Sequence, residues 1–174
     1  MMVFIVVESI MIAGVTLFQF NKKNSEYHEG RLERKENNLL VDIKYELQKN
    51  GINSINSLNN SMILEMADVH NLEFELYNLD GILLKSSTAL TGVRGTTILD
   101  DEILEYFQND NSSRYVIDDK NSSYFKSSYN LVSNFNNQPL GIIYIPYFAD
   151  DSSSKEELSG FLISLGFVHG NMIL

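Results

Sequence analysis

Residues 69–87 read VHNLEFELYNLDGILLKSS, and this stretch predicts the central hairpin of a small mixed domain. Three apolar residues alternate with Glu73, Glu75 and Tyr77, which is the two-residue period of a half-buried strand. Asp80-Gly81 then predicts a tight turn, because glycine accepts a positive φ without a Cβ clash. The chain returns over residues 82–84 as a second strand that ends at Ser86-Ser87.

Helices are predicted before this hairpin. Residues 24–49 carry apolar side chains at spacings near three, four and seven, with charged side chains between them, which is typical of a long amphipathic helix. Asn50-Gly51 is expected to end it, and a shorter helix is expected over residues 54–69. The apolar stripe of the long helix has two open interpretations, a coiled-coil seam of a homodimer or a cover for the chain's own sheet; it consists of Leu32, Leu39, Ile43 and Leu47.

Mostly strands are predicted after the hairpin. A short helix over residues 100–107 precedes strands over residues 114–117, 124–132 and 140–148. Pro146 lies near the end of the last strand and indicates an edge strand or an exit from the ladder. The order predicts an α+β fold in which a long N-terminal helix packs on a five-stranded antiparallel sheet.

Composition narrows the class of protein. The 174 residues fit one domain, and the formal net charge of −10 argues against a nucleic-acid partner, which needs clustered Lys and Arg. The chain contains no Cys, and its three His residues are isolated in the sequence, so no thiol chemistry, zinc site or other cofactor is expected.

Both ends of the chain are apolar. Residues 2–20 contain a single charge, Glu8, and as a helix would cover about 30 Å, the thickness of a bilayer core. We predict a transmembrane helix over residues 1–21; a cleaved signal peptide and a buried soluble helix are the alternatives. Residues 154–157 form a capping box ahead of a second apolar run, so residues 154–174 are expected to begin a second membrane helix of a longer protein.

The chain resembles the extracytoplasmic Cache or PAS-like input region of membrane-bound sensor histidine kinases. The similar stretches are RLERKE at 31–36, DVH at 68–70, LYNLDGILLKSS at 76–87 and PLGIIYIPYF at 139–148. The resemblance implies a PAS-like sheet, a homodimer, and a kinase core outside this chain. Residues 22–153 would then be an extracytoplasmic domain anchored in the inner (cell) membrane. The basic residues that follow the first apolar run, from Lys22 to Lys35, favour the opposite orientation by the positive-inside rule.

A ligand site is expected over the sheet, because similar PAS-like domains hold small molecules there. The Gly-containing loop at residues 88–99 is long enough to act as a lid. Four candidate ligand-binding residues are Arg94, Arg114, Tyr124 and Tyr144, whose guanidinium and hydroxyl groups suit an organic acid. The alternatives are a surface role for the arginines, packing for the tyrosines, and a domain that relays contact with a partner protein.

These observations predict a sensory module of a signal-transduction protein and not an enzyme. No nucleotide-binding motif or catalytic constellation accompanies the two apolar ends. The rival classes are a membrane-tethered hydrolase and a structural, membrane-anchored interaction domain.

Overall fold

The structure is a computed structural model that describes residues 2–49, 51, 54–88, 98–109, 112–117, 126–147, 158–160 and 162–164. The chain is divided into two compact units. The first consists of Met1–Arg31 and Ala149–Leu174, and the second of Leu32–Phe148. We call the second of these the sheet unit. The named elements, in chain order, are α1 (Met2–Lys49), η1 (Ile55–Ser57), α2 (Asn60–His70), β1 (Glu75–Tyr77), β2 (Leu83–Ser86), α3 (Asp101–Asn109), β3 (Arg114–Ile117), β4 (Lys126–Ser133) and β5 (Pro139–Tyr147).

Helix α1 is continuous from the apolar N-terminal run through the charged segment, as predicted. It stops before Gly51, whose φ of +61° suits glycine and whose N–H donates to the carbonyl oxygen of Gln48 at 3.0 Å. The four stripe residues Leu32, Leu39, Ile43 and Leu47 are 0–1% exposed in the single chain. Of the two interpretations, this burial supports the second, in which the stripe covers the chain's own interior.

The helix predicted over residues 54–69 is divided into two pieces. A short 3₁₀ turn, η1, precedes α2, and Asn59 separates them. The side-chain oxygen of Asn59 accepts from the N–H of Ser61 at 3.1 Å, which caps a new helix start. Asn71 ends α2 in the left-handed conformation, with φ of 47°. The apolar periodicity continues across the break, and this is why the sequence alone favoured one helix.

The predicted hairpin between β1 and β2 is confirmed, and its turn has the expected chemistry. Gly81 has a φ of +79° and donates its N–H to the carbonyl of Asn78 at 3.0 Å, and Asn78 donates to Ile82 at 2.9 Å. The prediction that β1 is half-buried is wrong. Glu75 and Tyr77, placed on the exposed side, are both fully buried, because β1 is covered on both faces.

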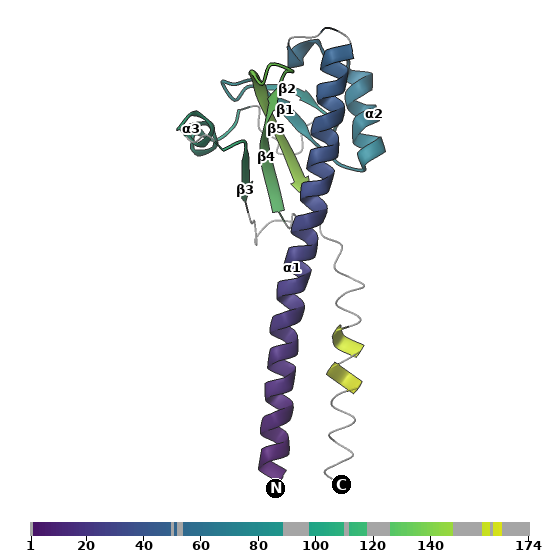
Figure 1. The fold of residues 1–174 in the computed structure, drawn as a ribbon, viewed down its shortest axis with the longest axis vertical. Helices are drawn as coiled ribbons and strands as arrows, with labels where there is room; N and C mark the ends of the chain where they lie inside the picture. Colours follow the sequence, from purple (N-terminus) through teal and green to yellow (C-terminus); the bar gives the residue numbers. More distant parts are fainter. Residues whose placement is uncertain are drawn as a thin grey trace. The chain divides into compact units, whose positions relative to one another are not determined.

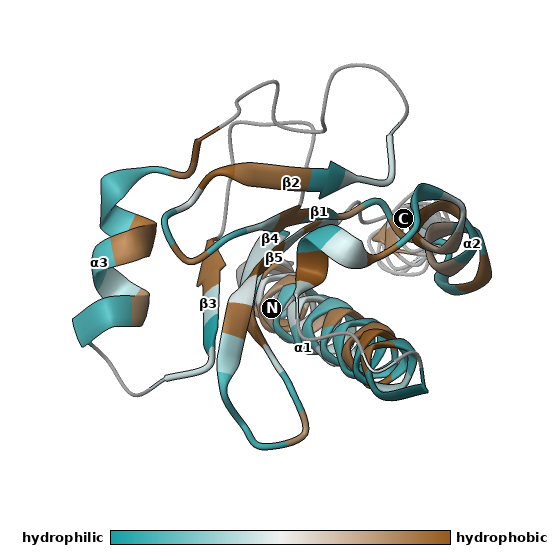
Figure 2. Cartoon of the chain, turned by 90° about the horizontal axis from the view of Figure 1, so that it is seen from above, coloured by the Kyte–Doolittle hydropathy of each residue, from teal (hydrophilic) through white to brown (hydrophobic). Residues whose placement is uncertain are grey.

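The five strands form one antiparallel sheet in the order β2-β1-β5-β4-β3 (Figures 1 and 2). The most apolar strand, β5, is central, so the expectation that Pro146 marks an edge strand is wrong. The alternative, an exit from the ladder, applies to the β1 side alone, because β1 pairs with β5 only over residues 142–144, whereas Pro146 stays paired with Ser127 of β4. Pro146 lies beyond this paired segment, where its missing N–H costs no bond to β1.

The sheet has two differently covered faces. On the first, α3 packs its apolar side, and Ile103 joins a buried cluster with Tyr77, Tyr129 and Tyr144 (Figure 2). We call this the α3 face. Alternation along the strands sends Ile143 and its same-face neighbours to the opposite side, where the part of α1 within the sheet unit runs (Figure 1). We call that the α1 face.

No helix in the part of the chain that the structure describes is both long enough and apolar enough to cross a membrane. The spans over residues 1–21 and 154–174 therefore stay predictions. The capping box at residues 154–157 lies outside the described residues.

Candidate functional site

The structure describes two of the four predicted ligand-binding residues. Arg94 and Tyr124 lie outside the described residues, as does most of the loop expected to act as a lid. Arg114 begins β3 and Tyr144 lies in β5. They are on opposite faces of the sheet, so they do not form one site. The separation follows from strand alternation, because Arg114 precedes Tyr115, and Tyr115 lies on the α3 face with Tyr144.

Arg114 is bound to the long helix on the α1 face. Its Nε donates to Oε2 of Glu36 at 2.7 Å, and its Nη2 donates to Oε1 at 3.5 Å. The Glu36 side chain is only 2% exposed, whereas that of Arg114 is 30% exposed. A buried carboxylate needs such a charged partner, so this guanidinium holds β3 to α1. The sequence offered no signal for the pairing, since 78 residues separate the two.

Tyr144 lies on the α3 face and is only 4% exposed. Its hydroxyl lies 3.3 Å from Oγ of Ser127, within hydrogen-bonding distance. Its ring lies 4.9 Å from the ring of Tyr129, centroid to centroid, on the neighbouring strand. Apolar ring faces and hydroxyl groups therefore meet in one place, which a polar organic molecule requires of its site.

A row of aromatic side chains crosses the sheet at this level. Tyr144 pairs with Tyr129, and Tyr129 pairs with Tyr115, so the three lie side by side on β5, β4 and β3. The ring centroids of Tyr115 and Tyr129 are 6.3 Å apart, and Tyr106 of α3 lies 4.5 Å from Tyr115. Direct cross-strand neighbours have their Cβ atoms close together, so register alone assembles this row.

On the next strand, β1, the position beside Tyr144 is occupied by Glu75, which pairs with it on the same face of the sheet. Its carboxylate is fully buried, and the hydroxyl of Tyr77 donates to Oε2 at 2.7 Å. Sequence reasoning missed this residue, because a Glu in an alternating strand was interpreted as solvent-facing. The signal that could have found it is the continuous apolar run at residues 140–145, which marks a central strand whose neighbours are buried on both sides.

At the outer end of the row, Tyr115 is held as a hydrogen-bond donor. Its hydroxyl donates to Oε1 of Glu102 at 3.1 Å. The pKa of Tyr115 is raised above its ordinary value, first by this hydrogen bond to the carboxylate, then by burial and by the negative charge of Glu102. The phenol therefore stays protonated at neutral pH and cannot act as a phenolate.

The α3 face thus gathers three hydroxyl groups and one carboxylate inside an apolar cluster; these are Ser127, Tyr77, Tyr144 and Glu75. Hydroxyls both donate and accept, and the carboxylate accepts, so the group suits a small polar molecule that carries donors such as an amine. Within the described residues, no group of three or more His, Cys, Asp or Glu side chains is placed to hold a metal ion. No protein-family model matches this chain, and no curated protein is significantly similar to it.

Proposed function

We propose that this chain is the sensory input region of a membrane-anchored sensor histidine kinase, and that it binds a small polar molecule on the α3 face. The main support for the proposal is the group of three buried hydroxyl groups and one buried carboxylate around Tyr144 and Glu75. Buried polar groups cost free energy unless they are satisfied, and they gather where a site needs orientation and specificity.

The fold supports the same proposal. The five-stranded antiparallel sheet, with a long N-terminal helix on one face and a short helix between β2 and β3 on the other, agrees with the PAS-like sheet that the resemblance implies. Because unrelated functions share folds, this likeness is an analogy, and the function is argued from the site.

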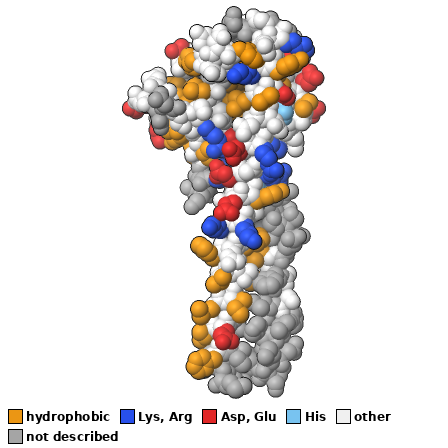
Figure 3. Space-filling view, viewed as in Figure 1, with side chains coloured by type: hydrophobic (Ala, Val, Ile, Leu, Met, Phe, Trp, Pro, Cys, Tyr) orange, Lys and Arg blue, Asp and Glu red, His pale blue; other side chains and the backbone are white. Residues whose placement is uncertain are grey.

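The exposed apolar side chains of the N-terminal part of α1 support a membrane anchor. Phe4 is 77% exposed, Ile10 66% and Phe18 70%. In Figure 3, hydrophobic side chains line this part of the helix, whereas charged ones gather further along the chain. Apolar surface of this extent needs an apolar partner, which we propose is the bilayer, with residues 22–153 on its outer side.

A homodimer remains part of the proposal, but through another surface. The predicted seam is buried in the single chain, so α1 would present its outer face instead. Val41 is 65% exposed on that face. It is apolar enough to pack against a second copy.

A thermal-shift screen of the full chain against amino acids, amines, organic acids and sugars tests the proposed function. One class is expected to raise the unfolding temperature by at least about 3 °C at saturating concentration. Tyr144→Phe and Ser127→Ala should weaken that ligand about tenfold or more in total, because each removes a hydroxyl from the site. Tyr147→Phe is the matched control, since Tyr147 lies in the same strand on the α1 face.

Two outcomes would contradict the proposed site. In the first, no compound of the four classes stabilises the chain. In the second, a ligand stabilises it, and Tyr144→Phe and Ser127→Ala leave the affinity as unchanged as Tyr147→Phe does.

A further inference from the structure

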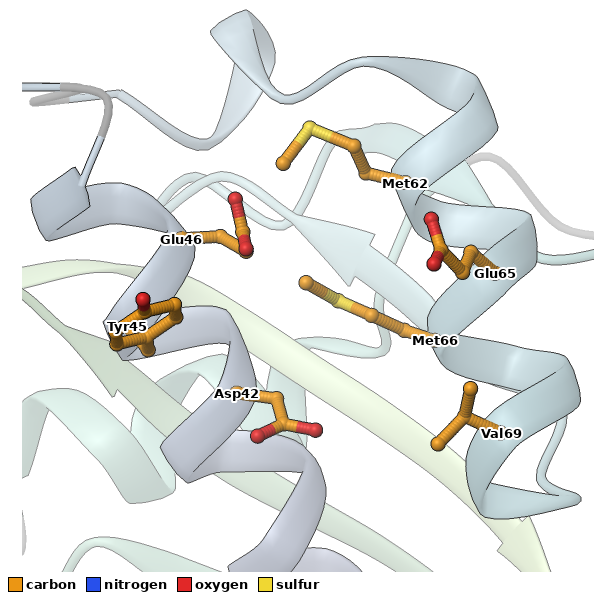
Figure 4. A pocket seen from close by; sticks show the side chains of 7 residues that line it. All are labelled: Asp42, Tyr45, Glu46, Met62, Glu65, Met66 and Val69. Atoms are coloured by element: carbon orange, nitrogen blue, oxygen red, sulfur yellow. The ribbon is translucent and has the colours of Figure 1, made fainter.

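A cavity of about 270 Å³ lies between α1 and α2 in the sheet unit, away from the α3 face. Asp42, Tyr45 and Glu46 reach it from α1, and Met62, Glu65 and Met66 reach it from α2 (Figure 4). The volume is just below the usual range for small-molecule sites, about 300–1,000 Å³, so only a compact ligand would fit.

The wall of this cavity combines an apolar surface with negative charge. The two methionines are flexible and polarisable, so they adapt to the shape of an apolar body. Three carboxylates, Asp42, Glu46 and Glu65, surround the same space, and none of the described residues that line it is basic. Such a lining favours a ligand that is both apolar and cationic.

The chain itself already places a cation at the edge of this cavity. Nζ of Lys49 lies 5.8 Å from the ring centroid of Tyr45 and 3.8 Å from Oε1 of Glu46. One ammonium group therefore contacts an aromatic face and a carboxylate, the two kinds of group that recognise organic cations. The Lys49 side chain is 59% exposed, so an incoming cation can displace it at small cost.

A second polar contact involves Asp42, another residue that lines the cavity. Nε2 of His70, the last residue of α2, lies 2.7 Å from Oδ2 of Asp42. This contact joins α2 to α1 through a residue that lines the cavity. The contact of Asp42 with His70 is shorter than the 3.8 Å contact of Glu46 with the exposed Lys49, so we take Glu46 and Glu65 as the carboxylates that meet a ligand.

We propose that the cavity between α1 and α2 binds a small organic cation, such as a quaternary ammonium compound, through Tyr45, Glu46 and Glu65, with Met62 and Met66 against its apolar part. The site is separate from the one proposed around Tyr144, and it stands or falls independently of the sensory function. Occupation would tie α2 to the helix that leads toward the N-terminal apolar run.

The test is a titration of the full 174-residue chain with choline, in a non-ionic detergent, followed by the NMR signals of ¹³C-labelled methionine methyl groups. The chain has six methionines, so the variants Met62→Leu and Met66→Leu are used to assign the methyl signals of Met62 and Met66. The uncharged isostere 3,3-dimethylbutan-1-ol is titrated in parallel. Choline is expected to shift both signals saturably, and at least about tenfold more tightly than the isostere, because only choline carries the charge.

Three variants and a control sharpen the test. Glu46→Gln and Glu65→Gln should each weaken choline about two- to fivefold. Lys49→Met should strengthen it by a similar factor, because the internal competitor is removed. Glu33→Gln, an exposed change on α1 outside the cavity, should leave the affinity unchanged.

Circular dichroism establishes that each variant is folded. The proposal is overturned if choline gives no saturable shift at Met62 and Met66 in the folded wild-type chain. It is equally overturned if the uncharged isostere binds as tightly as choline, or if the affinity for choline is the same in Glu46→Gln, Glu65→Gln and Glu33→Gln.

Discussion

Glu36 of α1 and Arg114 of β3 form an ion pair at 2.7 Å across the α1 face of the sheet, and the two partners differ sharply in exposure. The carboxylate is 2% exposed, whereas the guanidinium is 30% exposed. Removal of Arg114 and removal of Glu36 should therefore lower the free energy of unfolding by different amounts. Without Arg114 the buried carboxylate loses its charged partner, whereas without Glu36 the guanidinium can still turn toward water.

The first prediction uses this asymmetry. Arg114→Met should lower the free energy of unfolding by about 3 kcal/mol, and Glu36→Leu by clearly less. The double variant should recover most of the loss, because an apolar pair of similar size replaces the ion pair without a buried charge. Urea denaturation of all four proteins measures this. Additive losses in the double variant would show that the two side chains do not act as a pair.

The second prediction concerns alkaline pH. The folded-state pKa of Tyr115 is raised above its ordinary value of 10.0, so the hydrogen bond to Glu102 stabilises the fold fully below about pH 10 and is lost as pH rises through the raised pKa. Stability should therefore fall above pH 10 in the wild type and fall less in Tyr115→Phe.

Spectrophotometric titration gives an independent check of the same contact. Of the nine tyrosines, one should ionise at lower pH in Glu102→Gln than in the wild type, because the carboxylate acceptor and its charge are gone. An unchanged titration curve in Glu102→Gln would remove Glu102 as the cause of the shift.

The third prediction concerns Gly141, which immediately precedes the stretch of β5 that pairs with β1. A Cβ at this position would overlap the carbonyl oxygen of Tyr77 and press on the side chain of Ile55. Gly141→Ala should therefore lower the free energy of unfolding by about 1–3 kcal/mol. Gly30→Ala is the contrasting change, because nothing lies within 4 Å of its Cβ position in α1. It should stabilise the helix by up to about 1 kcal/mol, and equal effects at the two glycines would contradict this account.

The fourth prediction tests the proposed anchor by flotation of the full chain with lipid vesicles. The wild type should float with the vesicles and resist alkaline extraction, whereas Ile10→Glu should reduce the bound fraction, because a charge in the centre of a span costs about 2.5–3.5 kcal/mol. Val41→Glu is the matched control, since Val41 is 65% exposed and Ile10 66%. A wild-type chain that stays with the unbound fraction, or equal losses in both variants, would refute the anchor.

Local signals predicted much of this fold. The turn at Gly81, the end of α1 before Gly51 and the bounds of β3 all depend on residues within a few positions of each other. The division of the second helix at Asn59 was missed, because an apolar stripe continues through the break while the cap depends on one side chain.

The candidate site was predictable only in part, for a different reason. Tyr144, predicted for its hydroxyl group and flat apolar ring, lies on the α3 face, and its contact with a ligand stays a prediction. Glu75 and the partner of Arg114 were missed, since which face a strand buries, and what covers it, follows from pairing between distant segments. Periodicity gives the alternation along a strand, but not the identity of the neighbour that lies on it.

The pairing of β1 with β5 has a consequence for biosynthesis. Glu75 pairs with Tyr144, so the two lie 144 − 75 = 69 positions apart in the sequence. On the ribosome, α1 and the first hairpin emerge long before their central neighbour, and a three-residue β1 cannot hold its place without β5. Until β5 has emerged, β1 and β4 each present an unpaired edge, and nascent chains are then most exposed to wrong strand pairing.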